Sequence, residues 1–482
     1  MTRTTLRTAV SATIAVLVVF TGVALSPVPA AHASPLPIPP LLESSTNARG
    51  ERVFDLRVQS GSRTFSGNTR TETLGYNGDY LGPTIRVRRG EDVRIRVRNT
   101  LPEPTTVHWH GAHLPAASDG GPHQRIPAGG SWEAPFTVDQ PAATLWYHPH
   151  LMGTTAEQVY RGLAGLLIVD DDISESLAVP REYGRDDIPL LLQERRFSRG
   201  GSFEYRPSMP DLMHGYGGNA LLTNGALEPY IVIRDERVRL RLLNGSNSTV
   251  LRMTLDDGGS FHQIATDGGF LERPLERREL VLSPGERAEI VVDFSFRDAG
   301  PVTLLAESTS GRRYRALELR PATTELQKSR PLPTRLATIP DLASSGVDRR
   351  RQFVMSTMGR GGRLTINGRT MDMNRIDEVV QLDTTEIWEV SSEGGGMGGM
   401  MGGMMDVPHN FHVHGLQFQV LRVNGRRPPP ELRGWKDTVP LWPGDRIQIV
   451  LRFENYTGVF MYHCHFLEHE DEGMMGQFEV RR

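Results

Sequence analysis

The chain has 482 residues, which is too many for one ordinary hydrophobic core, and at about 100–200 residues per domain we expect two to four domains. Its formal net charge is -3 at pH 7, with no basic stripe or polybasic run, so nucleic acid and acidic membrane surfaces are not expected partners. Cys464 is the only cysteine, which excludes an internal disulfide bond.

The N-terminus has the pattern of an export signal. Arg3 and Arg7 precede an apolar run at 9–25, and the small-residue sequence Ala31-His32-Ala33 follows it. A membrane anchor is the alternative, but the run lies at the lower edge of the roughly 17–25 residues that span a bilayer. We therefore predict a cleaved signal peptide at 1–33, no stable membrane anchor, and an extracellular, cell-envelope or periplasmic location.

The rest of the chain repeats a strand-rich unit three times. Asn-Gly turns fall at Asn77, Asn224 and Asn367, so the unit recurs after 147 and then 143 residues. Each unit also has a Pro and Gly before a run of alternating apolar and charged residues, which predicts half-buried strands. We predict an all-β fold of three β-sandwich domains. Their expected limits are 45–172, 187–320 and 346–482, and they are joined by linkers at 173–186 and 321–345.

The histidines follow the same repeat. Ten of the fifteen lie in four short motifs, HWHG and YHPH in the first domain, HNFHVHG and YHCHFLEH in the third. The second domain has no histidine pair at the matching places, and we interpret it as a spacer without a metal site. The ten are His108, His110, His148, His150, His409, His412, His414, His463, His465 and His469.

These residues indicate a copper protein. His-x-His on a strand places both rings on one face, so pairs from two related domains can converge on one cluster. His409, Cys464 and His469 form a His₂Cys set with Met474 as a weak axial ligand, which is the blue-copper set. On a strand, Cys464 points away from its two histidine neighbours and links the sites. The eight remaining histidines can hold three coppers, and four coppers store the four electrons that reduce O₂ to water.

The four motifs HWHG, HPH, HxxHxH and HCHxxxHxxxxM resemble those of the multicopper oxidases, and most closely the bacterial laccase-like and copper-efflux (cuprous) oxidases. The resemblance covers the whole mature chain and implies cupredoxin-like Greek-key domains. It implies a type 1 site at His409, Cys464, His469 and Met474, and type 2 ligands at His108 and His412. It implies a type 3 pair held by His110, His148, His150, His414, His463 and His465.

Four further positions are singled out beside these ligands. Asp119 and Glu470 match acids that deliver protons to oxygen, although they could also be solvated acids or partners that orient histidines. Asn410 departs from the family, which usually has proline after the first histidine of the motif. Asp437, in GWKDT, is expected near the type 1 site.

A glycine-rich segment at 392–406 precedes the third histidine motif. It is either a neutral loop or a site that captures Cu(I), because thioethers are soft ligands. The hypothesis assigns Cu(I) binding to Met397, Met400, Met401, Met404 and Met405, with Asp406 as a hard ligand for the oxidised product.

We therefore predict a monomeric oxidase with four coppers per chain, one type 1, one type 2 and two type 3. It would use O₂ and a small phenol or aromatic amine, or Cu(I) itself. A copper nitrite reductase is a competing enzyme, but it would not need all four motifs. The alternatives of another class are a non-catalytic cupredoxin scaffold and a copper-storage protein.

Overall fold

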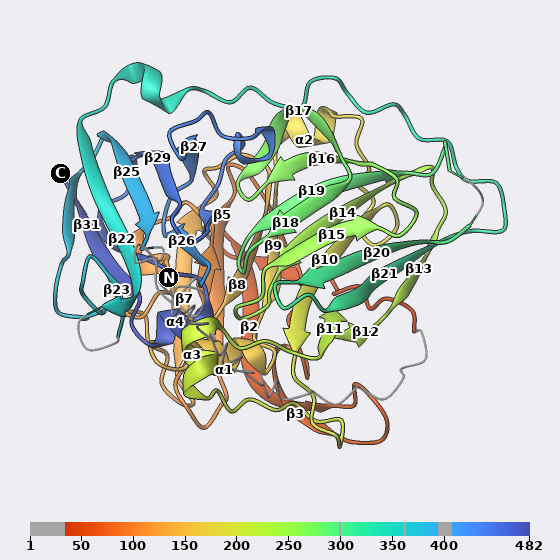
Figure 1. The fold of residues 1–482 in the computed structure, drawn as a ribbon, viewed down its shortest axis with the longest axis horizontal. Coiled ribbons are helices and arrows are strands. Elements are labelled where there is room, and N and C mark those ends of the chain that lie inside the picture. Colours follow the sequence, from red (N-terminus) through yellow and green to blue (C-terminus); the bar gives the residue numbers. More distant parts are fainter. Residues whose placement is uncertain (1–33, 298–299, 360–362, 394–406) are drawn as a thin grey trace, which may run out of the picture.

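The computed structural model describes residues 34–297, 300–359, 363–393 and 407–482. Within these residues the chain forms six sheets, two in each third of the sequence, and only short helices. Figure 1 shows the third pair of sheets on the left, the second on the right, and the first between and below them. The predicted all-β fold is confirmed.

The first sandwich packs a five-stranded sheet against a four-stranded one. The first sheet has the order β1 (Ser44–Thr46), β2 (Arg52–Arg63), β5 (Asp92–Asn99) and β7 (Ser131–Thr137), with β3 (Thr71–Tyr76) paired to β2. The second has the order β4 (Ile85–Arg88), β9 (Gly165–Asp170), β8 (Ala143–His148) and β6 (His108–His110). Apolar side chains from both sheets, such as Phe54 and Leu167, form one buried core.

The second sandwich has a larger first sheet. Its order is β12 (Ala226–Leu227), β11 (Ala220–Thr223), β10 (Asp187–Arg195), β14 (Arg237–Asn244), β19 (Arg287–Asp293), β16 (Phe261–Thr266) and β17 (Gly269–Arg277). The facing sheet has the order β13 (Tyr230–Ile233), β21 (Arg313–Pro321), β20 (Val302–Ser308), β15 (Leu251–Leu255) and β18 (Glu279–Leu282). Leu240 and Leu304 are buried between them.

The third sandwich has two five-stranded sheets. One has the order β23 (Arg363–Ile366), β22 (Arg349–Gly359), β25 (Thr385–Ser392), β29 (Arg446–Arg452) and β27 (Phe418–Val423). The other has the order β24 (Glu378–Gln381), β31 (Met475–Arg481), β30 (Gly458–His463), β26 (His409–Val413) and β28 (Thr438–Leu441). Trp388 and Phe411 lie in the core between these sheets, which also contains Cys464.

The three Asn-Gly turns that mark the repeat have the same geometry. Asn77, Asn224 and Asn367 have φ of 53°, 50° and 52°, a conformation that asparagine tolerates better than most residues. Each carboxamide accepts a hydrogen bond from a backbone N–H on β2, β10 or β22 and donates to a carbonyl two residues earlier in that strand. The repeat seen in the sequence is therefore a repeat of one structural unit.

Four short helices lie outside the sheets: α1 (Thr155–Tyr160), α2 (Asp172–Ser176), α3 (Met209–His214) and α4 (Leu467–Asp471). Helix α4 contacts both α1 and α3, so the three sandwiches meet beside the last histidine motif. The chain between β21 and β22 runs along the top of the view in Figure 1. Among the described residues, no helix is long and apolar enough to cross a membrane.

Candidate metal centres

Two strand pairs hold the histidine motifs. In the first sandwich β6 pairs with β8, with His108 opposite His148. In the third, β26 pairs with β30, with His412 opposite His463. The same antiparallel pairing therefore presents a histidine-rich edge from each of two sandwiches.

All eleven histidine and cysteine side chains of the motifs are buried, none more than 2% exposed. They separate into two sets, along β26 and at the end of β30, which ends at His463. His463 and His465 lie with histidines of the first sandwich, while Cys464 lies with His409 and His469. The structure thus brings the predicted ligands together as one set of eight histidines and one set around the cysteine.

Two triplets of histidines lie within the larger set. In the first, Nε2 of His150, His414 and His463 lie 3.0–3.1 Å from one another. In the second, Nε2 of His148 lies 3.4 Å from Nδ1 of His110 and 3.5 Å from Nε2 of His465. Each triplet combines rings from the first and third sandwiches.

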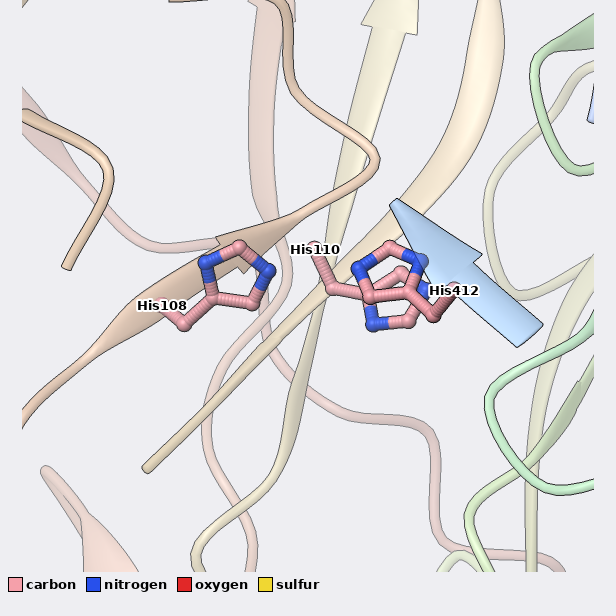
Figure 2. Close-up of side chains that lie close together, drawn as sticks. All are labelled: His108, His110 and His412. Atoms are coloured by element: carbon pink, nitrogen blue, oxygen red, sulfur yellow. The ribbon is translucent and has the colours of Figure 1, made fainter. Parts of the chain in front are cut away.

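The two remaining rings, His108 and His412, lie beside His110, and the three could share a metal ion. Figure 2 shows His108 and His110 on β6 and His412 on β26, with the rings of His110 and His412 overlapping. Those two rings stack with centroids 3.8 Å apart. Nε2 of both His108 and His412 is buried without a hydrogen-bond partner.

Most rings in the larger set are oriented by a bond on the nitrogen that faces away from it. When one ring nitrogen donates its N–H to a carbonyl, the other nitrogen carries a lone pair, which here points into the histidine set. His110 is reversed, because its Nε2 lies 3.0 Å from Oδ1 of Asp437 and its Nδ1 faces the set. The Nδ1–carbonyl pairs are His108 with Asp119, His148 with Pro149, His412 with Asp437 and His463 with Cys464.

Burial favours the neutral form of five of these rings. It lowers the pKa of His110, His148, His150, His412 and His463 well below the ordinary value. Neutral nitrogens at 3.0–3.5 Å repel one another when both present lone pairs. A cation among them relieves the repulsion, so the donor set fits nitrogen-ligated metal ions.

The cysteine set has the geometry of a small closed site. Sγ of Cys464 lies 3.6 Å from Nδ1 of His409 and of His469, which are 3.2 Å from each other. Burial raises the pKa of Cys464 to about 12, although backbone N–H groups of Asn410 and Phe466 act to lower it. The thiolate therefore needs a bound cation, which is the chemistry of a soft metal site.

Two neighbours complete this site. Met474 is fully buried in the same core, and its carbonyl accepts a hydrogen bond from the N–H of Cys464. Nε2 of His469 lies 3.2 Å from the carbonyl of Met213 on α3. The second sandwich therefore covers the outer edge of the cysteine set.

Comparison with known proteins gives the family. Models of the multicopper oxidase family match residues 57–174 and 332–482. Over 92% of its length the chain is 38% identical to a multicopper oxidase, mco, of Staphylococcus haemolyticus, covering 91% of that protein. The chain belongs to the multicopper oxidase family.

Two other relatives are informative. The crystal structure of a laccase from Pediococcus acidilactici superimposes with a TM-score of 0.86 at 35% identity, over 95% of each chain. The cell division protein FtsP of Escherichia coli is 37% identical, over 94% of this chain and 93% of that protein. Multicopper oxidase neighbours of this fold confirm the predicted cupredoxin-like sandwiches, and membership in the family implies copper.

The two acids singled out from the family motifs contact different rings of the histidine set. Oδ2 of Asp119 lies 2.9 Å from Nδ1 of His414. Burial acts to raise the pKa of Asp119, but the rings of His414 and His108 outweigh it, so the pKa is lowered and the carboxyl stays ionised.

Glu470, on α4, lies between two rings. Its carboxylate oxygens are 3.3 Å from Nδ1 of His150 and of His463, and neither oxygen has a hydrogen-bond partner. Burial raises the pKa of Glu470 well above the ordinary value. The two acids therefore differ in ionisation, because only the carboxylate of Asp119 accepts a hydrogen bond from a ring N–H, that of His414.

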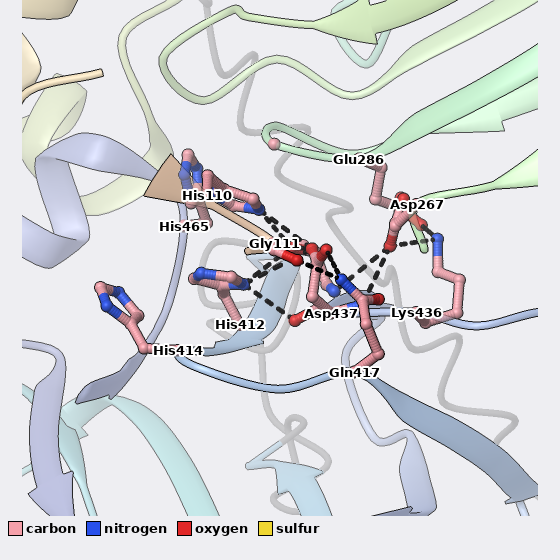
Figure 3. Close-up of polar contacts among 12 residues, drawn as sticks. His110, Gly111, Asp267, Glu286, His412, His414, Gln417, Lys436, Asp437 and His465 are labelled. Carbon is pink, nitrogen blue, oxygen red and sulfur yellow. Dashed lines mark hydrogen bonds and ion pairs between the residues drawn. The ribbon is translucent and has the colours of Figure 1, made fainter. Parts of the chain in front are cut away.

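Asp437 lies in a different place from the one expected. We expected it near the type 1 site, but its carboxylate contacts Nε2 of His110, and its backbone carbonyl accepts from Nδ1 of His412. Figure 3 shows these contacts, together with Gln417, which donates to Asp437. The prediction was wrong because Thr438, which follows Asp437, pairs with His412, whereas His409 pairs with Leu441. The side chain of Asp437 therefore lies beside the histidine set and contacts His110 of the first sandwich.

Charged residues of the second sandwich support Asp437, and the sequence motifs did not point to them. The guanidinium of Arg287 forms a double ion pair with Asp437, and both side chains have no exposed surface. Lys436 lies 2.9 Å from Asp267 and 2.6 Å from Glu286 (Figure 3). The only signal in the sequence was the Pro-Gly turn before Arg287, which identifies a turn and says nothing about its partners.

Two predictions lie outside the described residues. The signal peptide at 1–33 is one, and the segment with Met397, Met400, Met401, Met404, Met405 and Asp406 is the other. The domain limits and the ligand roles stay predictions.

Proposed function

We propose that the protein oxidises its substrate by one electron at a time and reduces O₂ by four electrons to two waters. This proposal rests mainly on the peptide of residues 463–465. Its cysteine belongs to one candidate copper set, and its two histidines belong to the two triplets of the other. Oxidation at one site and oxygen reduction at the other are thereby joined within three residues.

The proposed cofactor is four copper ions, which when bound supply reversible one-electron chemistry. His409, Cys464, His469 and Met474 would hold the type 1 ion, and His108 and His412 the type 2 ion. The type 3 pair would be held by His110, His148, His150, His414, His463 and His465.

The covalent route between the two sets is short. Cys464 is bonded through one peptide to His463 and through another to His465, and all three side chains are buried. We assign electron transfer to this peptide, because it connects the two sets without crossing solvent.

Glu470 and Asp119 are assigned to the protons. Four electrons and one O₂ require four protons to make two waters, so the oxygen site needs a supply of protons. Glu470 lies against His150 and His463 with an unpaired carboxyl group, which is the position of a general acid. Asp119 accepts a hydrogen bond from Nδ1 of His414 with its carboxylate and one from Nδ1 of His108 with its backbone carbonyl.

The substrate is a phenol or aromatic amine, or Cu(I). The laccase similarity supports the first group. The methionines Met397, Met400, Met401, Met404 and Met405 support the second, because thioethers select Cu(I) and the segment ends three residues before His409. Four phenols, or four Cu(I) ions, lose one electron each for every O₂ reduced.

The test is oxygen uptake by the copper-loaded protein with Cu(I) and with 2,6-dimethoxyphenol, with and without residues 394–405. If deletion lowers only the Cu(I) rate, the protein is a cuprous oxidase with a capture segment. If both rates persist, it is a laccase and the methionines are incidental. No oxygen uptake with either substrate, despite a full copper load, would refute the oxidase proposal.

A non-catalytic copper-binding or storage role is the second candidate. The relative named cell division protein FtsP shows that the similarity of this chain extends to a protein named for another process. Copper binding without oxygen uptake is the result this candidate predicts, so the same experiment separates the two.

We also propose that the protein is exported after removal of residues 1–33 and acts as a monomer. N-terminal sequencing of the native protein should begin at Ser34. A native protein that begins at residue 1 would contradict cleavage.

A further inference from the structure

A turn in the second sandwich lies against both candidate copper sets. It comprises residues 283–287, with the sequence SPGER: the four residues between β18 and β19 and Arg287, the first residue of β19. Among the described residues, no histidine, cysteine or acid of this sandwich belongs to the candidate metal groups. Any effect of the turn on the copper sites must therefore come from how it positions their ligands.

We propose that the turn at 283–287 positions the two copper centres relative to each other, so that the second sandwich determines copper affinity and the properties of the cysteine site without supplying a ligand. The inference rests on the proposed function, because it takes the two sets to be copper sites. Three separate contacts carry it.

The first contact reaches the cysteine set through Asn410. Its Nδ2 donates to Oγ of Ser283 at 3.0 Å and to the carbonyl of Pro284 at 2.7 Å. Its Oδ1 accepts from the N–H of His465 at 2.7 Å and lies 3.8 Å from Sγ of Cys464. The carboxamide thus joins the turn to the peptide that connects the two centres. The proline that the family usually has here could make none of these side-chain bonds.

The second contact is a close approach of backbone to two rings. Gly285 has φ of 82°, and a Cβ there would lie 3.1 Å from Cγ and Nδ1 of His465 and 3.2 Å from Cε1 of His110. These distances are shorter than ordinary van der Waals contact. The backbone of the turn therefore forms a wall against one face of the triplet that contains both rings.

The third contact is the ion pair of Arg287 with Asp437. The guanidinium binds both carboxylate oxygens of Asp437, and one of these oxygens lies 3.0 Å from Nε2 of His110. The backbone carbonyl of Asp437 holds His412 at 2.9 Å. Glu286, also in the turn, binds Lys436 beside it (Figure 3). A partner that orients a metal-binding histidine typically changes metal affinity or activity tenfold to a hundredfold when removed.

The repeat provides a matched control for these contacts. The third sandwich has the equivalent turn WPGDR, in which Gly444 has φ of 81° and nothing within 4 Å of an added Cβ. Replacing either glycine by alanine therefore causes the same backbone strain, because the two positions have nearly the same positive φ. Only at Gly285 would the added Cβ also contact histidine rings.

The experiment compares the full-length, copper-loaded variants Gly285→Ala and Gly444→Ala with the wild type. We measure copper per chain, copper affinity by competition with a chelator, the absorption band and reduction potential of the cysteine site, and folding by circular dichroism. We expect Gly285→Ala to lose copper affinity about tenfold to a hundredfold at the histidine set and to shift the cysteine band. Gly444→Ala should match the wild type in all copper properties.

Two milder variants keep the proposal testable if Gly285→Ala does not fold. Ser283→Ala removes one bond to Asn410 and should shift the reduction potential of the cysteine site without loss of copper from the histidine set. Arg287→Lys keeps the charge but loses the paired hydrogen bonds, and should weaken copper binding at the histidine set while the cysteine band stays unchanged.

The outcomes separate the inference from the proposed function. If the wild type loads copper and shows the cysteine band, but the turn variants equal Gly444→Ala in affinity, band and potential, the inference is overturned alone. If the wild type takes up no copper, the proposed function and the inference both fail.

Discussion

Most rings of the eight-histidine set are oriented by a hydrogen bond on the nitrogen that does not face the set. Four rings donate from Nδ1 to a backbone carbonyl, at 2.7–3.0 Å. One of these four, His463, also faces Glu470, as does His150. Such outer contacts determine which tautomer is present and how the ring is aimed, and so prepare the site before any metal binds.

At the same scale, Glu470 can be tested as a proton donor. Glu470→Gln keeps the size of the side chain but cannot release a proton. We expect the rate at which O₂ reoxidises the reduced protein to fall about 10²–10⁴-fold, the usual contribution of a general acid, while reduction by substrate continues. Stopped-flow measurements of the two half-reactions check this.

The exposed Glu472, two residues further along the chain, is the control for that experiment. Glu472→Gln makes the same chemical change outside the site and should leave both rates unchanged. Equal reoxidation rates in Glu470→Gln and the wild type would remove Glu470 from the proton path.

At the scale of elements, the same Asn-Gly turn occurs in both exposed and buried surroundings. Asn77 and Asn367 are exposed, whereas Asn224 is 3% exposed. Asn224 also donates to the carbonyl of Pro37, so it connects the N-terminal segment to the second sandwich. Burial makes the same carboxamide more important in the second copy, because water cannot replace its partners.

This difference predicts unequal effects on stability. Asn224→Gly keeps the backbone freedom that the positive φ requires but leaves the N–H of Leu191 and two carbonyls without their partner. We expect a loss of about 1–3 kcal/mol in the free energy of unfolding, measured by urea denaturation. Asn77→Gly is the matched variant and should cost less, since solvent reaches that turn. Equal losses would show that burial does not matter here.

At the scale of the whole molecule, the three sandwiches meet around the candidate copper sites. Rings come from the first and third, while the second contributes the 283–287 turn and the α3 carbonyl that covers His469. Lys436, Asp267 and Glu286 form a buried charged group between the second and third. The sites are therefore a property of the assembled chain and of no single domain.

This arrangement predicts an acid sensitivity of the copper-free protein. Burial lowers the pKa of His414 to about 4, of His465 to about 3 and of His469 to about 4. Unfolding restores an ordinary pKa near 6.5, so below that pH the unfolded state binds more protons than the folded state. Stability is therefore full above about pH 6.5 and falls as the pH drops toward 4.

Thermal unfolding of the copper-free and copper-loaded proteins between pH 7.5 and 4.5 checks this expectation. Copper binds the folded state, so the loaded protein should have the higher midpoint at every pH, by mass action. A copper-free midpoint that does not change between pH 6.5 and 4.5 would contradict the neutral, buried state of these rings.

Much of the site could be predicted from local sequence because alternation on a strand is a local property. Cys464 between His463 and His465 had to face the opposite way from its neighbours, and His-x-His had to present two rings on one face. The threefold repeat also followed from turns and alternating runs, without knowledge of any long-range contact.

Contacts across hundreds of residues could not be predicted in this way. Arg287 and Asp437 are 150 residues apart, and His110 and Asp437 are 327 apart. Asp437 was expected at the wrong site, and the second domain was interpreted only as a spacer. In each of these residue pairs, the sequence around one residue gives no indication of the other.

The sequence by itself determined the all-β repeat, the copper-type donor residues and the two faces of the 463–465 peptide, since each depends on neighbours within a strand or turn. Only the tertiary structure decided which nitrogen of each ring faces its set, and where Asp437 points. It also decided that Gly285 and Arg287 lie against the histidines, because these features depend on how three separately folded sandwiches pack together.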